Sequence, residues 1–382
     1  MSQKKKARIL FDNLFVHRGG VEVVMWHIIN RLVKEGYDVT LAAIHWAGDE
    51  EKDVIPPGVH FVRRYCRRKN YREHSPRWFA NRIYARIYNA LIANYLSLQN
   101  FDLAISMQEK WTMKRTDGIR AKRKIAWVHT DYSTRVKAEK GAFPTAAEEK
   151  ACMQRFEKVV CVSETAKNGI IQTLGDPGNL CVLYNPIDAN GIRARAQAPC
   201  PVKRDADRPL LVSVGRLVAE KQYLMLLKAC RLLQETVPFD LWIIGDGEER
   251  ETLEKYITEH HMSYVRLLGA QDNPFPYVCQ ADLFVSSSVT EGYGLTIQEA
   301  LILDVPVVAV SCPAVLESLD PRYGLLTGNS ETELAEGMKK VLQHPELMKS
   351  FREKITGACL GEEMYEKRLQ AICGLLKSVG NV

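Results

Sequence analysis

The segment from Leu283 to Val310 constrains the fold of this chain more than any other. An apolar run, Leu283–Ser286, is followed by a polar turn over residues 287–294. The spacing predicts a helix over residues 295–303, and a second apolar run predicts a strand over 305–310. Strand, turn, helix and strand in this order form the unit of a parallel sheet covered by helices. Ligands of such sheets bind at the carboxyl ends of the strands.

Two carboxylates mark this segment. Glu291 lies in the turn and Glu299 follows eight residues later, which is roughly 12 Å along a helix axis. The N-terminus of a helix favours phosphate, and Gly292 and Gly294 let the backbone approach a ligand closely. A phosphate with hydroxyl-bearing groups on either side describes a nucleotide sugar. The alternative interpretation is that Glu291 only caps the helix and that Glu299 is solvated.

Two features of the first half of the chain suggest a second set of ligand groups. The first predicted strand is Ala7–Phe11, and a polar turn over residues 12–20 ends in Gly19 and Gly20, which open a helix. The glycine pair fits either a phosphate or closely approaching substrate, or simply a tight turn. A strand over residues 124–128 places His129 at the carboxyl edge of the sheet, where it either acts on a ligand or only satisfies backbone groups.

A basic turn follows the first predicted strand of the second half, residues 209–214. It reads Gly215-Arg216-Leu217, and Lys221 opens the next helix. Arginine offers a planar fork of donors and lysine a compact charge, so this turn suits a diphosphate. The alternative is that both side chains are ordinary surface cations.

Composition indicates a soluble chain with two domains. The chain has 382 residues, of which 46% are hydrophobic and 26% charged. Its ten cysteines show no C-x-x-C pair or metal-binding spacing, which favours buried thiols in a reducing cytosol and no metal site. No secretory signal and no membrane-spanning segment is predicted. We therefore expect a cytoplasmic location, with attachment to the inner face of the cell membrane as a further option.

The basic residues concentrate in the first half. Residues 1–190 carry 31 Lys and Arg against 20 Asp and Glu, whereas the remainder carries 21 against 26. The stretch from Arg63 to Arg86 contains nine of these basic residues and only one acidic residue, Glu73. The nine are Arg63, Arg64, Arg67, Arg68, Lys69, Arg72, Arg77, Arg82 and Arg86.

This basic stretch merges into a predicted helix over residues 78–98. Every fourth residue of the helix is apolar, which gives a stripe of Phe79, Ile83, Ile87, Leu91 and Tyr95. Either the stripe packs in the core and the basic face is solvated, or the region contacts an anionic membrane or a phosphate-bearing acceptor. We expect no nucleic-acid partner, because no recognised binding motif accompanies the charge.

The motifs together resemble those of the family 4 retaining glycosyltransferases, which have the GT-B fold. Glu291 to Glu299 match the E-x7-E signature of that family. Other matching stretches follow in the family's order: Gly19-Gly20-Val21-Glu22, His129, Ser163-Glu164, Asn185-Pro186-Ile187-Asp188, Gly215-Arg216-Leu217, Glu220-Lys221 and Gly245-Asp246-Gly247.

The resemblance implies an α/β fold with two facing Rossmann-like domains and an interdomain cleft. We expect the acceptor-side domain at residues 1–188, completed by a C-terminal helix at about 364–382. The nucleotide-sugar domain is expected at 207–363, after an Ala-, Pro- and Arg-rich linker at 189–206.

The resemblance also assigns roles. Catalytic positions are Glu291, His129, Arg216 and Lys221. Arg216 and Lys221 match the diphosphate ligands, Glu299 the ribose ligand and Glu291 the residue that contacts the donor sugar. Donor-binding backbone is implied at Gly19, Gly20, Gly215, Gly292, Tyr293, Gly294 and Leu295. Such enzymes use no cofactor and take a nucleotide sugar as co-substrate. They need no metal, because arginine, lysine and the helix N-terminus offset the charge of the leaving diphosphate.

The implied function is retaining, metal-independent transfer of a sugar, with a UDP-linked donor, to a glycan or lipid-linked acceptor in surface polysaccharide or glycolipid synthesis. Two alternatives remain: a sugar-nucleotide epimerase on the same fold, and a non-catalytic subunit that binds nucleotide sugar. The sequence departs from the family pattern at three sites. Gln222 and Asp304 each stand where glycine is common, and Pro313-Ala314 replaces a frequent glycine pair.

Overall fold

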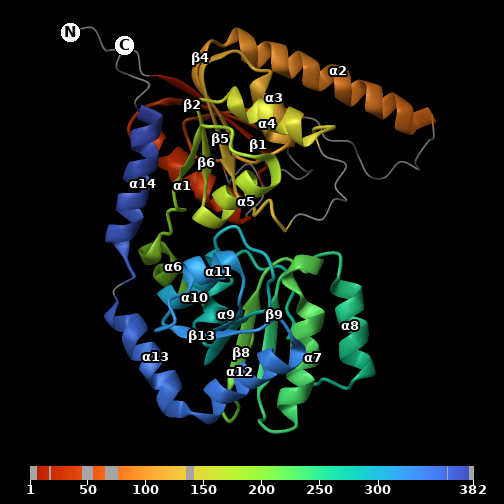
Figure 1. Cartoon of the computed structure of the whole chain (residues 1–382), viewed down its shortest axis with the longest axis vertical. Coiled ribbons are helices and arrows are strands. Elements are labelled where there is room, and N and C mark those ends of the chain that lie inside the picture. Colours follow the sequence, from red (N-terminus) through yellow and green to blue (C-terminus); the bar gives the residue numbers. More distant parts are fainter. Residues whose placement is uncertain are drawn as a thin grey trace. The chain divides into compact units, whose positions relative to one another are not determined.

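A computed structural model describes residues 7–16, 19–44, 55–64, 76–134, 142–358 and 360–377 (Figure 1). The chain divides into two compact units. Unit 1 comprises Met1–Pro186 with Lys367–Val382, and unit 2 comprises Ile187–Glu366. Each unit is built around its own parallel sheet.

The sheet of unit 1 has the order β3-β2-β1-β4-β5-β6-β7, and all of its strand pairs are parallel. Chain order therefore reverses direction between β1 and β4, which makes their carboxyl ends the switch point where ligands of such sheets bind. The strands are β1 Arg8–Phe15, β2 Asp38–Ile44, β3 Val59–Arg64, β4 Phe101–Ser106, β5 Ala121–Val128, β6 Lys158–Cys161 and β7 Leu180–Val182.

The helices of unit 1 are α1 Gly20–Lys34, α2 Pro76–Leu98, α3 Trp111–Asp117, α4 Ala146–Gln154, α5 Glu164–Leu174 and α14 Glu362–Lys377, of which α14 begins in unit 2. α1 shows why such segments are helical: its apolar residues, among them Ile28 and Leu32, recur on one face and are fully buried. α14 is held by an ion pair between Lys377 and Glu35, with Nζ 2.7 Å from Oε2.

The sheet of unit 2 has the order β10-β9-β8-β11-β12-β13 and is also parallel, with its switch point between β8 and β11. Successive residues of its strands alternate between two apolar cores: Leu241 and Ile243 face one core, and Trp242 and Ile244 face the other. The strands are β8 Leu210–Val214, β9 Asp240–Ile244, β10 Val265–Leu267, β11 Leu283–Ser286, β12 Val307–Val310 and β13 Gly324–Thr327.

The helices of unit 2 are α6 Ala189–Ala196, α7 Tyr223–Gln234, α8 Arg250–Glu259, α9 Phe275–Val278, α10 Leu295–Ile302, α11 Pro313–Ser318, α12 Glu331–Gln343 and α13 Pro345–Gly357, with a 3-10 turn at Ala219–Lys221. In the part of the chain that the structure describes, no helix combines the length and the apolar content needed to cross a membrane.

The order of elements around the opening segment is confirmed, because β11, α10 and β12 follow one another there. Two other expectations were wrong, and one of the two alternatives for α2 is excluded. The predicted polar turn from residue 12 is strand as far as Phe15, and Asp12 is fully buried. Residues 189–196 of the expected linker are helix α6, whose Ile192 packs against Phe275 of α9. The apolar stripe of α2 does not pack in the core, since Ile83, Ile87 and Leu91 are each more than half exposed.

Candidate functional site

The switch point of unit 2 brings together the loops that follow β8 and β11. Two hydrogen bonds join these loops. The hydroxyl of Ser287 donates to the carbonyl of Lys221 at 2.7 Å, and the amide of Val289 donates to the carbonyl of Glu220 at 3.1 Å. The basic turn and the Glu291 turn, which sequence analysis treated separately, therefore form one structural feature.

Close backbone packing against the basic turn explains the glycines of the loop after β9. A Cβ on Gly245 would lie 1.9 Å from the carbonyl oxygen of Gly215, and one on Gly247 would lie 2.3 Å from that of Leu217. The amide of Leu217 also donates to the carbonyl of Asp246 at 3.0 Å. The loop after β9 thus supports the loop that carries Arg216, and it does so without side chains.

The two cations of the basic turn differ in their surroundings. The Nζ of Lys221 lies 2.5 Å from Oε1 of Glu291, and both side chains are less than one fifth exposed. Arg216 is exposed, and its guanidinium makes no hydrogen bond or ion pair with any residue that the structure describes. One cation is therefore fixed in place, whereas the other is available to an anion from outside.

The turn between Glu291 and α10 requires glycine at one position. Gly294 has a φ of 70°, and a Cβ there would lie 2.9 Å from the hydroxyl oxygen of Ser318. α10 begins directly after Gly294, and no side chain caps its N-terminus. The interpretation of Glu291 as a helix cap is therefore wrong. Within the described residues, the amides of Leu295 and Thr296 make no backbone hydrogen bond, so these two remain for a ligand. Tyr293, by contrast, has a buried side chain.

Glu299 lies on α10 and is mostly buried. Burial raises the pKa of Glu299 to about 7, and the nearby charge of Arg195 only partly opposes this shift. Its carboxylate makes no hydrogen bond within the described residues. The alternative of a solvated Glu299 is therefore wrong. A carboxylate held in a desolvated place without a donor is poised to accept hydrogen bonds from a ligand.

His129 follows β5 at the carboxyl edge of the sheet of unit 1, and its ring nitrogens have different environments. The ring hydrogen-bonds the backbone of Met107, whereas Nε2 is buried without a hydrogen-bond partner. Burial lowers the pKa of His129 to about 4, against the opposing charge of Glu109. The ring is therefore neutral at pH 7. Because its bond to a carbonyl needs the proton on Nδ1, Nε2 carries a free lone pair that can accept a hydrogen bond.

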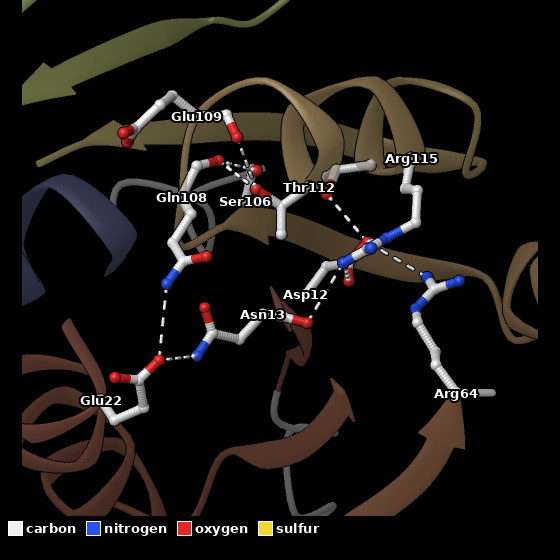
Figure 2. A network of polar contacts seen from close by, with 10 residues as sticks. Asp12, Asn13, Glu22, Arg64, Ser106, Gln108, Glu109, Thr112 and Arg115 are labelled. Carbon is white, nitrogen blue, oxygen red and sulfur yellow. Dashed lines mark hydrogen bonds and ion pairs between the residues drawn. The ribbon is translucent and has the colours of Figure 1, made fainter. Parts of the chain in front are cut away.

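The glycine pair of unit 1 adjoins a polar network that sequence analysis missed (Figure 2). Gly19 precedes α1, and a Cβ there would lie 2.6 Å from Oε2 of Glu22. Glu22 accepts hydrogen bonds from Asn13 at 2.9 Å and from Gln108 at 3.4 Å. The network thus ties the start of α1 to the carboxyl ends of β1 and β4, the switch point of this sheet.

Asp12 occupies the buried side of the same network (Figure 2). It accepts from Arg64 Nη2 at 3.1 Å, from Arg115 Nη2 at 3.0 Å and from the hydroxyl of Thr116 at 3.3 Å. Burial lowers the pKa of Arg64, and Asp12 opposes that shift. Arg64 was expected to be a surface cation, and this was wrong. Its neighbour Arg63 is exposed, and residues 67–72 of the basic stretch lie outside the described residues.

Two family models match the chain over nearly its whole length. The model described as Glycosyltransferase Family 4 matches residues 18–190, and the model described as Glycosyl transferases group 1 matches residues 197–357. The chain belongs to glycosyltransferase family 4. This glycosyltransferase has the GT-B fold of its structural neighbours, one of which is HepE of Anabaena, in complex with UDP and glucose. That structure is 18% identical, has a TM-score of 0.73, and the match covers 97% of this chain and 100% of HepE.

Two curated relatives of this glycosyltransferase are named bacterial glycosyltransferases. An N-acetylgalactosamine-N,N'-diacetylbacillosaminyl-diphospho-undecaprenol 4-alpha-N-acetylgalactosaminyltransferase of Campylobacter jejuni is 30% identical over 177 residues, which cover 45% of this chain and 47% of the relative. The lipopolysaccharide core biosynthesis glycosyltransferase LpsE of Rhizobium meliloti is 31% identical over 176 residues, which cover 45% and 51% respectively. The matched part thus spans about half the length of these relatives. Family membership places the chain among the glycosyltransferases.

Proposed function

We propose that this glycosyltransferase transfers a sugar from a UDP-linked donor, with retention of the anomeric configuration, to a glycan or lipid-linked acceptor. One observation carries the donor half of the proposal: at the switch point of unit 2, an available Arg216 and a fixed Lys221 lie in the same joined loops as Glu291. The cations and the helix N-terminus match the diphosphate of a nucleotide sugar, and the carboxylate matches the hydroxyl groups of its sugar.

The proposed diphosphate position is between the basic turn and the start of α10. Arg216 would hold the phosphates through its planar fork, and Lys221 would add a charge whose orientation Glu291 already fixes. The uncapped amides of α10 would contribute further donors. Gly215 and Gly294, which are needed to form the two turns, contribute only backbone.

Two carboxylates would then hold the hydroxyl groups of the donor. Glu299 would accept hydrogen bonds from the ribose, because a carboxylate that is desolvated and has no donor gains most from such bonds. Glu291 would contact the transferred sugar. In unit 1, the lone pair of His129 Nε2 would accept a hydrogen bond from a sugar hydroxyl, and Gly20 would offer close backbone approach.

The proposed reaction needs no enzymic nucleophile. The bond between the anomeric carbon and the phosphate oxygen breaks while the acceptor oxygen attacks from the same face. The acceptor proton passes to the departing phosphate oxygen. Arg216 and Lys221 stabilise the charge that develops on the diphosphate, which is the largest catalytic contribution we assign to this chain. A two-step route through a glycosyl–enzyme intermediate on Glu291 is the competing scheme.

A donor screen tests this function. The purified chain is mixed with UDP-, GDP- and ADP-linked sugars, with and without extracts that contain glycan and lipid-linked acceptors, and released nucleoside diphosphate is measured. We expect release that depends on both a UDP-sugar and an acceptor, and at least tenfold weaker UDP binding by Arg216→Ala. Arg266→Ala is the matched control, because Arg266 is also an exposed arginine of unit 2. Equal UDP binding by both variants, or release only from GDP- or ADP-sugars, would contradict the proposal.

A further inference from the structure

Helix α2 exposes a broad apolar face. Large apolar side chains along it are half exposed or more, namely Phe79 50%, Ile83 59%, Tyr84 53%, Ile87 56%, Leu91 61%, Tyr95 51% and Leu98 77%. Figure 1 shows α2 as the long orange helix of unit 1. Single exposed apolar residues are common on protein surfaces, but a set of seven on one helix marks an interaction surface.

The seven side chains share one side of the helix. At about 100° per residue they fall within an arc of about 160°. The opposite side contains Ala85, Ile92 and Leu96, of which Leu96 is fully buried in a core that includes Leu10 and Phe101. The inward side thus packs α2 onto unit 1. Burial in the core of unit 1 does not explain why the outward side is apolar.

The charges of α2 are all positive. Arg77, Arg82 and Arg86 are exposed, and the sequence of the helix contains no aspartate or glutamate. By helical geometry, Arg82 and Arg86 border one edge of the apolar arc and Arg77 the other. Arg63 adds a fourth exposed cation near the helix, since its carbonyl accepts a hydrogen bond from Tyr88 at 3.4 Å.

We propose that α2 lies in the interface of an anionic phospholipid membrane and attaches unit 1 to it. An apolar face bordered by arginines is the pattern of helices that lie in the plane of a bilayer surface. The aliphatic residues would enter the acyl boundary, Tyr84 and Tyr95 would lie at the headgroup level, and the arginines would reach lipid phosphates. This attachment is independent of the proposed donor, and it would bring a lipid-linked acceptor to unit 1.

A second copy of the chain fits this surface less well. Two α2 helices face to face would place six arginines together, and neither helix has a carboxylate to pair with them. A nucleic acid offers phosphates but no apolar phase for seven side chains. A membrane rich in anionic lipid supplies both the phosphates and the apolar phase, so charge complementarity selects it.

Vesicle binding tests the proposal, and it requires neither donor nor turnover. The full chain is sedimented with phosphatidylcholine vesicles that contain or lack 40% phosphatidylglycerol. We expect binding to the anionic vesicles, weaker at 1 M salt, where the Debye length is about 3 Å. Ile83→Gln/Ile87→Gln/Leu91→Gln should lower the binding constant at least tenfold. Arg77→Gln/Arg86→Gln should lower it up to about thirtyfold on anionic vesicles and leave weak binding to neutral ones unchanged.

Matched controls replace the same numbers of exposed apolar and basic residues elsewhere in the chain. Ile171→Gln/Leu232→Gln/Met364→Gln alters three exposed apolar residues of other helices, and Arg266→Gln/Lys349→Gln alters two exposed cations of unit 2. Both should bind vesicles like the parent. The proposal is overturned if the α2 triple variant, folded by circular dichroism, binds anionic vesicles as the parent does. It is equally overturned if the parent ignores them at low salt, or if sedimentation velocity shows a parent dimer that only the triple variant loses.

Discussion

Lys221 and Glu291 are 70 residues apart in sequence, yet Nζ of the lysine lies 2.5 Å from Oε1 of the glutamate. The ion pair joins the loop after β8 to the loop after β11 at the switch point of unit 2. It couples two residues that the E-x7-E signature and the basic turn suggested independently. Because the ion pair orients both side chains, replacing either residue removes one charge and also releases the other side chain from its position.

Lys221→Ala and Arg216→Ala should both lower the rate of transfer by about 10²–10³, because each removes one preorganised charge from the leaving diphosphate. Their stabilities should differ. Lys221→Ala leaves a mostly buried Glu291 unpaired and should lower the free energy of unfolding by about 1–3 kcal/mol, whereas the exposed Arg216 should contribute nothing measurable. Urea unfolding and initial rates measure the two effects.

A Lys221→Met/Glu291→Gln variant is the control: it should recover stability and remain inactive. Rates within twofold of the parent for both alanine variants would exclude the assigned role.

Transfer should retain the anomeric configuration and should not require a divalent cation, since Arg216, Lys221 and the N-terminus of α10 already supply positive charge for the diphosphate. NMR of the product determines the configuration at the new bond. Rates after treatment with EDTA, with and without added Mg²⁺ or Mn²⁺, determine the metal requirement. An inverted product, or activity lost to EDTA and restored by metal, would refute the corresponding half of this prediction.

Glu299→Gln should stabilise the protein at alkaline pH and weaken its affinity for the donor. The pKa of Glu299 rises from 4.5 to about 7 on folding, so the folded state binds more protons between these values and its stability falls as pH rises through them. The glutamine variant lacks this loss. At about 1.4 kcal/mol per pKa unit, its gain over the parent should grow from near zero at pH 4.5 to about 3 kcal/mol at pH 8.

The same carboxylate should give the donor affinity of the parent a pH dependence. KM for the donor should rise as pH falls below 7, because a protonated Glu299 accepts hydrogen bonds from hydroxyl groups less well. The rise should be absent from Glu299→Gln but present in His129→Gln, since His129 with a pKa of about 4 stays neutral over this range. A pH profile that all three proteins share would count against the ribose role.

Asp12→Ala should lower the free energy of unfolding by about 3–5 kcal/mol, because it leaves the fully buried guanidinium of Arg64 without a carboxylate. Arg64→Gln should lower the free energy of unfolding by less than Asp12→Ala does, since Arg115 and Thr116 still donate hydrogen bonds to Asp12. The matched control is Arg63→Gln, which alters an exposed neighbour and should change stability by less than about 0.5 kcal/mol. Urea midpoints compare the three, and equal effects of Arg63→Gln and Arg64→Gln would contradict the network.

Gln222→Gly should raise the free energy of unfolding by about 1 kcal/mol. Gln222 has a φ of 49°, a left-handed conformation that costs L-residues roughly 1–2 kcal/mol, and its side-chain Oε1 is buried without a partner. Asp304, with a φ of 59°, should gain less from glycine, because its carboxylate accepts a hydrogen bond from Thr356 that the change removes. Thermal unfolding of both variants tests the order. A destabilised Gln222→Gly would show that this side chain supports the loop in another way.

The sequence by itself determined most of the local structure of unit 2. β11, α10 and β12 follow from apolar periodicity and a glycine turn, and these signals are local along the chain. The departures at Gln222 and Asp304 also marked real features, since both positions have a positive φ for which glycine is the ordinary residue. The sequence also predicted that Arg216 and Glu291 lie in turns after strands and that Glu299 lies on the following helix, and the structure has them there. The binding roles of these residues come from the family resemblance and stay predictions.

Only the tertiary structure decided which polar residues are buried and which apolar residues are exposed. Asp12 was expected in a turn and Arg64 on the surface, but the parallel alignment of β1 and β3 with β2 between them buries the pair. The stripe of α2 has the periodicity of a core helix, yet the helix packs through Ala85 and Leu96 instead. A periodic pattern of apolar residues indicates only that one face of the helix is apolar. Whether protein or something else covers that face depends on packing between segments far apart in sequence, which no local signal carries.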